Sequence, residues 1–219
     1  MPSQKATQRV YPRKTEPIIA AAEEAFLRWG FDGASVDTIA EMANVSKKTV
    51  YNNFANKEAL FAEVIQKRCD EVVPPVVDEA MMLQDPEETL VAIGSTFLRK
   101  LFAPEQVQLY RTVAAESRQF PEFGRMMFEG PIMRTQASFD TYLRRQVQMG
   151  RLEFPDLDLA ASQFVALLKG NVHMQLMLNQ PAQVTPRRLD QMTRAAVRLF
   201  LQGAARTAEP ARKTQRRKP

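Results

Sequence analysis

The sequence has little of the residues that build disulfide scaffolds and metal sites. It contains one cysteine, one histidine and one tryptophan among 219 residues. A single cysteine excludes an intrachain disulfide and fits a reducing, cytoplasmic setting. One cysteine and one histidine also make a transition-metal site implausible. We therefore expect no metal and no cofactor.

Long apolar runs and catalytic patterns are missing too. No stretch approaches the roughly 18 apolar residues of a membrane span, and residues 1–14 lack the apolar core of a secretory signal. There is no glycine-rich phosphate loop, no metal-spaced ligand cluster and no credible Cys/His or Ser/His pair. We predict a protein that contacts no membrane, has no catalytic residues and is not an enzyme. A helical enzyme is kept as a remote alternative.

The net charge of +5 is weak support for nucleic-acid binding. Residues 206–219 hold six Lys or Arg and one acid, which accounts for the whole surplus. The local distribution says more, because residues 1–14 hold four basic residues and residues 44–57 hold three, with no acid in either segment. We expect 206–219 to be a disordered basic tail. Residues 1–14 are either a basic arm that enters the minor groove of DNA or a disordered leader.

Helical spacing dominates the rest of the chain, and no stretch alternates with period two. Ile18, Ala22, Phe26 and Trp29 fall on one face of a first helix, which Gly30 is expected to end. Asn56 is expected to cap a fourth helix that the prolines at 74–75 end or kink. Proline and glycine then separate further helices, predicted at 87–102, 105–117, 131–149, 157–178 and 186–202. The expected fold class is all-α, with about nine or ten helices.

Residues 35–54 carry the clearest functional signal. Ser35 and Ser46 can cap two short helices. Ala40 and Ala43 are small enough for these helices to cross closely, and Asn44 tolerates the positive φ of a tight turn. The second helix contains lysines, threonine, tyrosine and asparagines but no acid. This pattern is typical of a helix-turn-helix whose second helix enters the major groove, rather than of an ordinary hairpin with a solvated basic face.

Residues 15–65 resemble the N-terminal domain of the TetR/AcrR family of bacterial transcriptional regulators. The matching residues are Phe26, Gly30, Phe31, Ser35, Val36, Ile39, Ala40, Ala43, Val45, Ser46, Tyr51, Phe54, Lys57, Glu58 and Leu60. Asn44 departs from the usual Gly of the family, and Asn53 stands where an aromatic residue or His is frequent. The resemblance implies that ten residues face DNA: Ser35, Thr38, Ser46, Lys47, Lys48, Thr49, Tyr51, Asn52, Asn53 and Lys57.

These residues divide by role. Lys47, Lys48 and Asn52 lie on the exposed side of the second helix and are the candidates for reading base edges. The candidates for holding phosphates and setting the register are Ser35, Thr38, Ser46, Thr49, Tyr51 and Lys57. A phosphate contact from Asn53 has weaker support because of its departure from the family.

Residues 110–123 and 150–161 resemble the AefR-like C-terminal domain of one subgroup of the family. The resemblance implies a helical bundle that binds a small effector and forms a homodimer. Pocket candidates are Phe97, Leu101, Tyr110, Met126, Met127, Phe139, Leu143, His173, Met174 and Met177. Dimer-interface candidates are Phe164, Leu168, Val172, Leu189, Met192, Ala196, Leu199 and Phe200. Plain core packing within one chain is the alternative for each of these side chains.

The expected organisation is a basic arm at 1–14, a three-helix DNA-binding domain at 15–60, an effector-binding and dimerisation domain at 61–205, and a tail at 206–219. The expected partners are double-stranded operator DNA, a second copy of the chain, and a small apolar or amphipathic effector. We therefore expect a repressor, located in the bacterial cytoplasm and on the nucleoid when bound, that such a ligand releases from a palindromic operator. The alternative is a constitutive DNA-binding protein without an effector, which the lack of a cavity of about 300 Å³ would favour.

Overall fold

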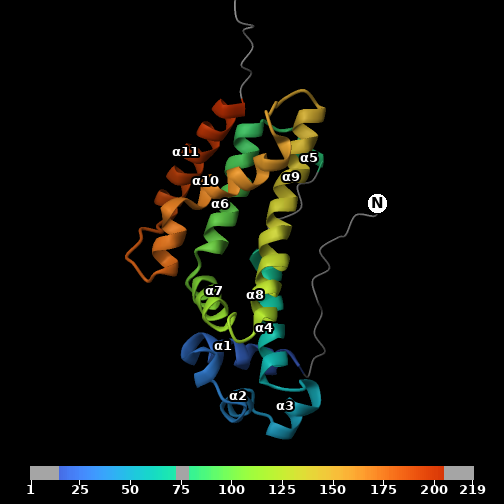
Figure 1. The fold of residues 1–219 in the computed structure, drawn as a ribbon, viewed down its shortest axis with the longest axis vertical. Helices are drawn as coiled ribbons and strands as arrows, with labels where there is room; N and C mark the ends of the chain where they lie inside the picture. Colours follow the sequence, from blue (N-terminus) through green and yellow to red (C-terminus); the bar gives the residue numbers. More distant parts are fainter. Residues whose placement is uncertain (1–14, 73–78, 205–219) are drawn as a thin grey trace, which may run out of the picture.

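The computed structural model describes residues 15–72 and 79–204, and all regular structure in these ranges is helical (Figure 1). The expected arm, the prolines at 74–75 and the tail lie outside the described residues. The elements are α1 (Glu16–Gly33), α2 (Val36–Met42), α3 (Lys47–Asn53), α4 (Lys57–Val72), α5 (Glu79–Leu83), α6 (Pro86–Leu101), α7 (Pro104–Glu116), α8 (Pro121–Met127), the π-helix η1 (Phe128–Ile132), α9 (Met133–Gln148), α10 (Leu157–Met177) and α11 (Pro186–Ala204). The all-α prediction is confirmed, and the five helices expected after residue 80 form within two residues of their predicted ends.

Proline fixes where several helices begin. Pro86, Pro104, Pro121 and Pro186 are each the first residue of a helix. A proline at this position loses nothing, because the first N–H groups of a helix have no intrahelical acceptor and its fixed φ is already helical. Asp85 adds a side-chain cap to α6 by accepting hydrogen bonds from the N–H groups of Glu87 (2.9 Å) and Glu88 (3.1 Å).

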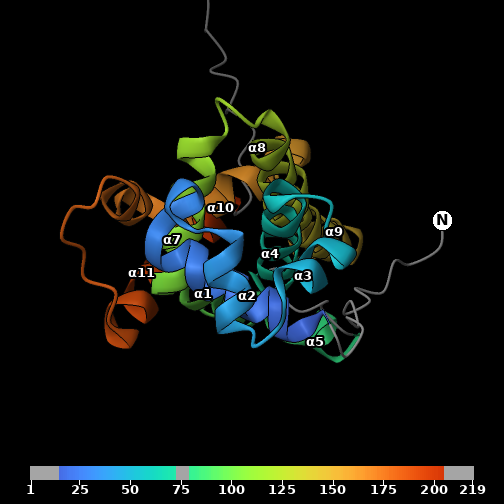
Figure 2. The ribbon, with the colours of Figure 1, turned by 90° about the horizontal axis from the view of Figure 1, so that it is seen from below.

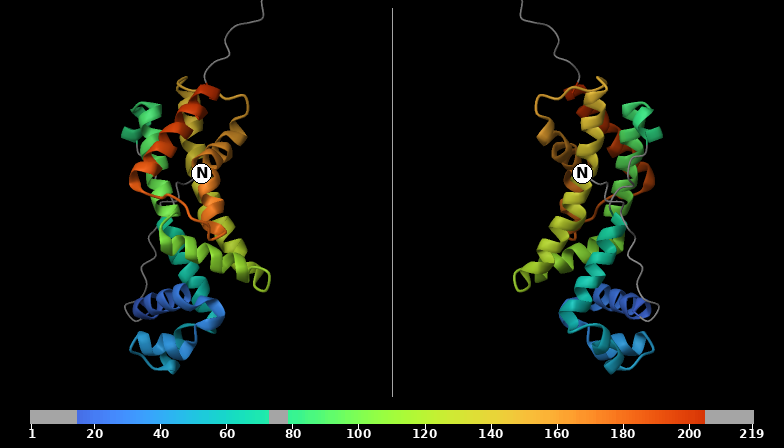
Figure 3. Two further views of the ribbon diagram at one scale, coloured as in Figure 1. Left: turned by 90° about the vertical axis from the view of Figure 1, so that its left-hand side faces the viewer. Right: turned by 90° about the vertical axis from the view of Figure 1, so that its right-hand side faces the viewer.

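The molecule is elongated, with α1, α2 and α3 at one end and α5, α6, α10 and α11 towards the other (Figures 1 and 3). Seen from below, the short helices α2 and α3 lie nearest the viewer (Figure 2). Two long elements join the ends. One is α4, and the other is the rod formed by α8, η1 and α9, which runs without a break from Pro121 to Gln148. Within the described residues, none of the helices combines the length and apolar character needed to cross a membrane.

The first core surrounds a cluster of phenylalanine rings. Phe26 and Phe31 of α1 and Phe61 of α4 pack together with Phe120 and with Phe123 of α8, at centroid distances between 4.8 and 5.8 Å. The same core includes residues of α2, α3 and α7. The three-helix unit is therefore packed directly onto the following helices, with no flexible linker between them.

Trp29 corrects the expected face of the first helix. Its side chain is 41% exposed, and the neighbouring Phe31 is buried instead. Gly30 adopts φ 72° and ψ −178°, which interrupts α1 and redirects the chain, so Phe31 takes the core position. The guanidinium carbon of Arg28 lies 4.9 Å from the centroid of the Trp29 ring.

The second core is built by α6, α9, α10 and α11. It buries five of the side chains expected at the dimer interface: Phe164, Leu168, Leu189, Ala196 and Phe200. Helices of the same chain already cover these five side chains, and their place at a dimer interface stays a prediction. Leu199 is 59% exposed and Val172 and Met192 are half-buried, so these three remain available to a partner.

Phe123→Ala should lower the free energy of unfolding by about 3–5 kcal/mol, because Phe123 is fully buried among three other rings. Urea unfolding followed by circular dichroism measures the change. The matched control is Phe128→Ala on the same rod, whose ring is 56% exposed and whose loss should change stability by less than about 0.5 kcal/mol. Equal losses for both variants would contradict the assignment of the first core.

Candidate functional site

Two short helices at the end of the molecule begin with the same cap. Ser35 Oγ accepts a hydrogen bond from the N–H of Thr38 at 3.0 Å, and Ser46 Oγ accepts one from the N–H of Thr49 at 3.1 Å. The hydroxyls of each Ser/Thr pair also lie 2.8 and 2.9 Å apart. These bonds fix where α2 and α3 start. Ser35 and Ser46 thus act as helix caps, and their contacts with phosphate stay predictions.

The turn between α2 and α3 depends on one left-handed residue. Asn44 has φ 52°, as the sequence predicted for this position. The Asn44 N–H donates to the Glu41 carbonyl at 3.0 Å, and the Val45 N–H donates to the Ala40 carbonyl at 2.9 Å. This pair of bonds is the Schellman motif, which satisfies the last carbonyls of α2. It sets the direction in which α3 leaves the turn.

The turn places α3 with its polar face outward. Val50 is buried beneath the helix, whereas Lys47, Lys48, Tyr51 and Asn52 are exposed. The helix contains no acid, and its outward side chains offer both positive charge and hydrogen-bonding groups. A surface of this kind suits the phosphates and base edges of a DNA groove.

The two lysines of α3 differ in their partners. Lys47 Nζ donates to Asp37 Oδ2 of α2 at 2.8 Å, and this hydrogen bond and the Asp37 charge raise the pKa of Lys47. Among the described residues, Lys48 has no ion-pair partner and is exposed. Because the positive charge of Lys47 is partly neutralised within the protein, Lys48 is the stronger unpaired charge on α3.

Two other candidate DNA contacts turn towards the protein. Lys57 Nζ donates to the carbonyls of Phe31 (2.9 Å) and Ala34 (3.3 Å) and lies 4.4 Å from the centroid of the Phe31 ring. It thereby ties the end of α1 to the start of α4. Asn53 Nδ2 donates to the Thr49 carbonyl at 2.7 Å, on its own helix. DNA contacts by Lys57 and Asn53 stay predictions, and both would have to compete with these internal bonds.

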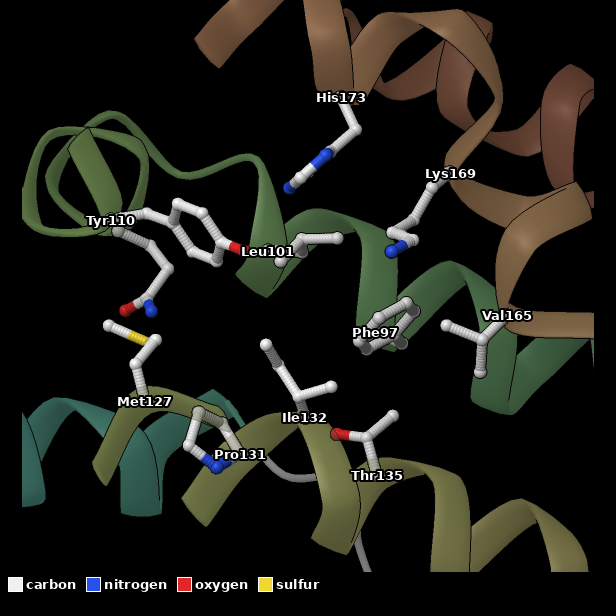
Figure 4. A pocket seen from close by; sticks show the side chains of 11 residues that line it. Phe97, Leu101, Tyr110, Met127, Pro131, Ile132, Thr135, Val165, Lys169 and His173 are labelled. Carbon is white, nitrogen blue, oxygen red and sulfur yellow. The ribbon is translucent and has the colours of Figure 1, made fainter. Parts of the chain in front are cut away.

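A narrow cavity lies farther along the molecule, where α6, α7, α10 and the α8–η1–α9 rod meet (Figure 4). Its lining residues are Phe97, Leu101, Gln106, Tyr110, Met127, Pro131, Ile132, Thr135, Val165, Lys169 and His173. It has about 50 Å³ of space for the centres of water molecules, which is room for only a few waters. A larger ligand therefore requires its walls to move apart.

Half of the predicted pocket residues line this cavity: Phe97, Leu101, Tyr110, Met127 and His173. The other five do not. Phe139 and Leu143 are buried in the second core, and Met126 packs against the first. Met174 is 58% exposed because it follows His173 on α10 and so points about 100° away from the cavity. Met177 also lies outside the lining.

The sequence reasoning missed three polar residues of the cavity, namely Gln106, Thr135 and Lys169. Gln106 and Thr135 are buried, and Lys169 is half-buried. Burial lowers the pKa of Lys169, while burial and the nearby Lys169 charge lower the pKa of His173. A signal for Lys169 existed, because it follows directly on the apolar stretch from Phe164 to Leu168 in the middle of a helix.

The cavity walls contain two irregular backbone segments. Gly170 adopts φ 47° and ψ −155° inside α10, between the cavity residues Lys169 and His173. The π-helix η1 contains Pro131, which also lines the cavity. Such interruptions leave weaker helical hydrogen bonding than a regular α-helix. They mark the places where the walls can deform.

Comparison with known proteins identifies both parts of this chain. The family model described as bacterial regulatory proteins, tetR family, matches residues 18–64, which contain α2 and α3. The model described as the AefR-like transcriptional repressor, C-terminal domain, matches residues 88–203, which contain most of the cavity-lining helices. The candidate DNA-binding surface and the cavity thus fall in separate matched regions.

Individual proteins extend the match. The uncharacterized HTH-type transcriptional regulator YhgD of Bacillus subtilis is 28% identical over 61% of this chain and 66% of its own length, which is just under two thirds. A solved putative TetR-family transcriptional regulator from Mesorhizobium loti is 29% identical with a TM-score of 0.81, covering 87% of this chain and 96% of that one. The solved flavonoid-responsive regulator FrrA is 32% identical with a TM-score of 0.71 and the same two coverages.

Lys48→Ala should weaken binding to the operator by about 1–3 kcal/mol if Lys48 reads a base, and by less if it meets only phosphate. Fluorescence anisotropy with a footprinted operator fragment at fixed salt measures this, and a scrambled fragment separates the two cases. The control is Lys100→Ala, an exposed lysine on α6. Unchanged affinity for Lys48→Ala would remove α3 as the recognition helix.

Asn44→Ala should lower the free energy of unfolding by about 1 kcal/mol, because alanine tolerates a left-handed backbone less well than asparagine. Asn44→Gly should leave the free energy of unfolding almost unchanged. Glycine adopts the left-handed backbone without strain, but it also gives the unfolded chain more conformational freedom, and the two effects offset each other. Asn52→Ala is the matched control within α3 and should not destabilise. A stable Asn44→Ala variant would argue against the left-handed turn.

Proposed function

We propose a ligand-released repressor mechanism for this chain, which belongs to the TetR family of bacterial transcriptional regulators. It regulates transcription through its N-terminal helix-turn-helix. The observation that carries the proposal is the exposed, acid-free α3 held by the Ser46 cap and the Asn44 turn. The ten sequence-predicted residues around it form the proposed DNA surface, with Lys48 contributing the most to binding.

The proposed binding unit is a homodimer on a palindromic operator. A two-fold dimer presents two copies of α3, whose half-sites lie about 34–36 Å apart or a multiple of this. Exposed apolar side chains on α10 and α11 support a partner surface there. Leu159, Leu167 and Leu199 are 50%, 39% and 59% exposed, which is unfavourable in a lone protomer when several gather.

The route from the cavity to DNA runs through α4. Arg134 of α9 donates to the Gly130 carbonyl of η1 at 3.1 Å and to Asp70 Oδ1 of α4 at 2.7 Å. Gly130 also lies against Cys69 of α4, where an added Cβ would be 3.6 Å from the sulfur. A ligand that widens the cavity at η1 would therefore displace α4, which starts beside α3. This motion changes the spacing of the two recognition helices.

Ligand release requires an effector with a strong preference for the widened state of the cavity. Moving the protein from almost fully DNA-competent to almost fully released needs a ligand that prefers the widened state by about 5.5 kcal/mol. A response to ligand is supported by the irregular walls at Gly170 and η1. It is also consistent with FrrA, which is named as flavonoid-responsive.

The second candidate is a constitutive DNA-binding regulator without an effector. The small cavity favours this reading, because its space of about 50 Å³ is well below that of a ligand site of about 300 Å³ or more. The two candidates differ in whether any small molecule changes operator affinity, and they agree on DNA binding itself.

Deleting the gene should raise transcription from the promoters that the protein occupies, because a bound repressor blocks initiation there. Genomic footprinting in the host locates these promoters, and transcript counts in the deletion strain measure the change. A strain carrying Lys48→Ala should behave like the deletion, whereas one carrying Lys100→Ala should behave like the wild type. Transcripts that fall on deletion would make the protein an activator and overturn the repressor proposal.

A further inference from the structure

The cavity contains a set of polar groups with a consistent chemical character. Gln106 and Tyr110 come from α7, Thr135 from α9, and Lys169 and His173 from α10. None of the lining residues is acidic. Figure 4 shows the Lys169 ammonium, the His173 ring and the Tyr110 hydroxyl turned towards the middle of the cavity. The set can donate several hydrogen bonds and includes one ammonium group, that of Lys169.

Two of these groups lack partners within the described part of the chain. Lys169 has no ion-pair partner there, and burial is the one cause of its lowered pKa. Thr135 Oγ1 is buried and has no hydrogen-bond partner. A half-buried, unpaired ammonium and a buried, unpaired hydroxyl each cost free energy. Both groups face the cavity, so a polar ligand that entered it could satisfy them.

Apolar side chains form the rest of the cavity wall. Phe97, Leu101 and Val165 surround Lys169 within the cavity. On the other side, Tyr110, Met127 and Ile132 also line a second, more open groove between α7 and the α8–η1 segment, with about 200 Å³ of space. These three side chains therefore separate the cavity from the groove. An elongated apolar group could pass between them once η1 moves.

We propose that this cavity binds an organic anion with an apolar body, with a single carboxylate on Lys169 and the apolar part running past Tyr110, Met127 and Ile132 into the groove. This assignment rests on the proposed ligand-released repressor and names the chemical class of its effector. Medium-chain monocarboxylates are the representative ligands.

The charges in the cavity favour a carboxylate over neutral, cationic and phosphate-bearing ligands. A neutral apolar ligand would cover the half-buried Lys169 ammonium without supplying a counter-charge, and a cation would add repulsion. A phosphate carries more charge than one lysine neutralises, and such groups are usually held by arginine clusters or helix N-termini. A carboxylate matches one ammonium and accepts further hydrogen bonds from Thr135, Tyr110 or His173.

The test compares ligands that differ only in the head group. Decanoate, decanol and decylamine are titrated into the full-length protein below their aggregation concentrations, with calorimetry as the readout. A second pair, 2-naphthylacetate and 2-naphthylethanol, asks whether a ring serves as the apolar body. We expect the carboxylate of at least one pair to bind at least tenfold more tightly than its alcohol, and decylamine to bind weakest.

Lys169→Met isolates the charge, because methionine keeps an unbranched apolar side chain. It should reduce carboxylate affinity at least tenfold and leave alcohol affinity unchanged, while Lys100→Met should change neither. His173 is the chain's single histidine, so its NMR signal can be followed without further assignment. Carboxylate binding should raise the His173 pKa, because a bound anion stabilises the protonated ring. Far-UV circular dichroism checks that Lys169→Met remains folded.

Three outcomes would overturn the anion assignment. They are equal affinities for carboxylate and alcohol, a carboxylate preference that survives in Lys169→Met, and no binding of any probe. Operator affinity measured in the same samples tests the ligand-released repressor separately from the anion site. Carboxylate binding that leaves operator affinity unchanged would keep the anion site but refute ligand release. Operator binding and derepression on deletion without any carboxylate binding would keep the repressor and refute the anion site.

Discussion

The packing of Phe31 and Phe61 against Phe123 is the contact on which the rest of the molecule depends. These rings belong to α1, α4 and α8, so one buried cluster joins the DNA-binding helices to the helices that line the cavity. Aromatic pairs of this size supply much of the burial energy available to a short three-helix unit. The helix-turn-helix is thus stabilised by packing against the helices that line the cavity. A movement of the cavity helices would therefore displace the helix-turn-helix.

The DNA-binding element could be read from the sequence because its determinants are local. The Ser35 and Ser46 caps and the Asn44 turn each involve residues at most five positions apart, and their bonds follow from residue type and spacing. The helix starts at Pro86 and Pro104 follow from the same kind of rule. Lys47 and Lys57 were harder, because their partners Asp37 and Phe31 lie on other helices.

The cavity could be predicted only in part, because its residues come from six separate elements. Composition suggested an apolar, methionine-bearing lining, and Met127 lines the cavity whereas Met174 does not. Which way a helix turns each side chain decides this, and a single sequence leaves that rotation open when much of a helix is apolar. Lys169 is the opposite case. A charge within an apolar helix was visible, but what it faced depended on α6 and α9.

Gly170 interrupts the α10 wall of the cavity at a single backbone position. Before it, α10 is anchored in the second core by Phe164 and Leu168. After it, Arg111 Nε of α7 donates to the Leu176 carbonyl at 2.9 Å and holds the last turns of α10 against α7. Lys169 and His173 lie on opposite sides of this joint. Val172 and Leu176, which follow the joint, also pack against the second core. Opening the cavity at Gly170 would therefore cost part of this packing, and the proposed ligand would have to offset that cost.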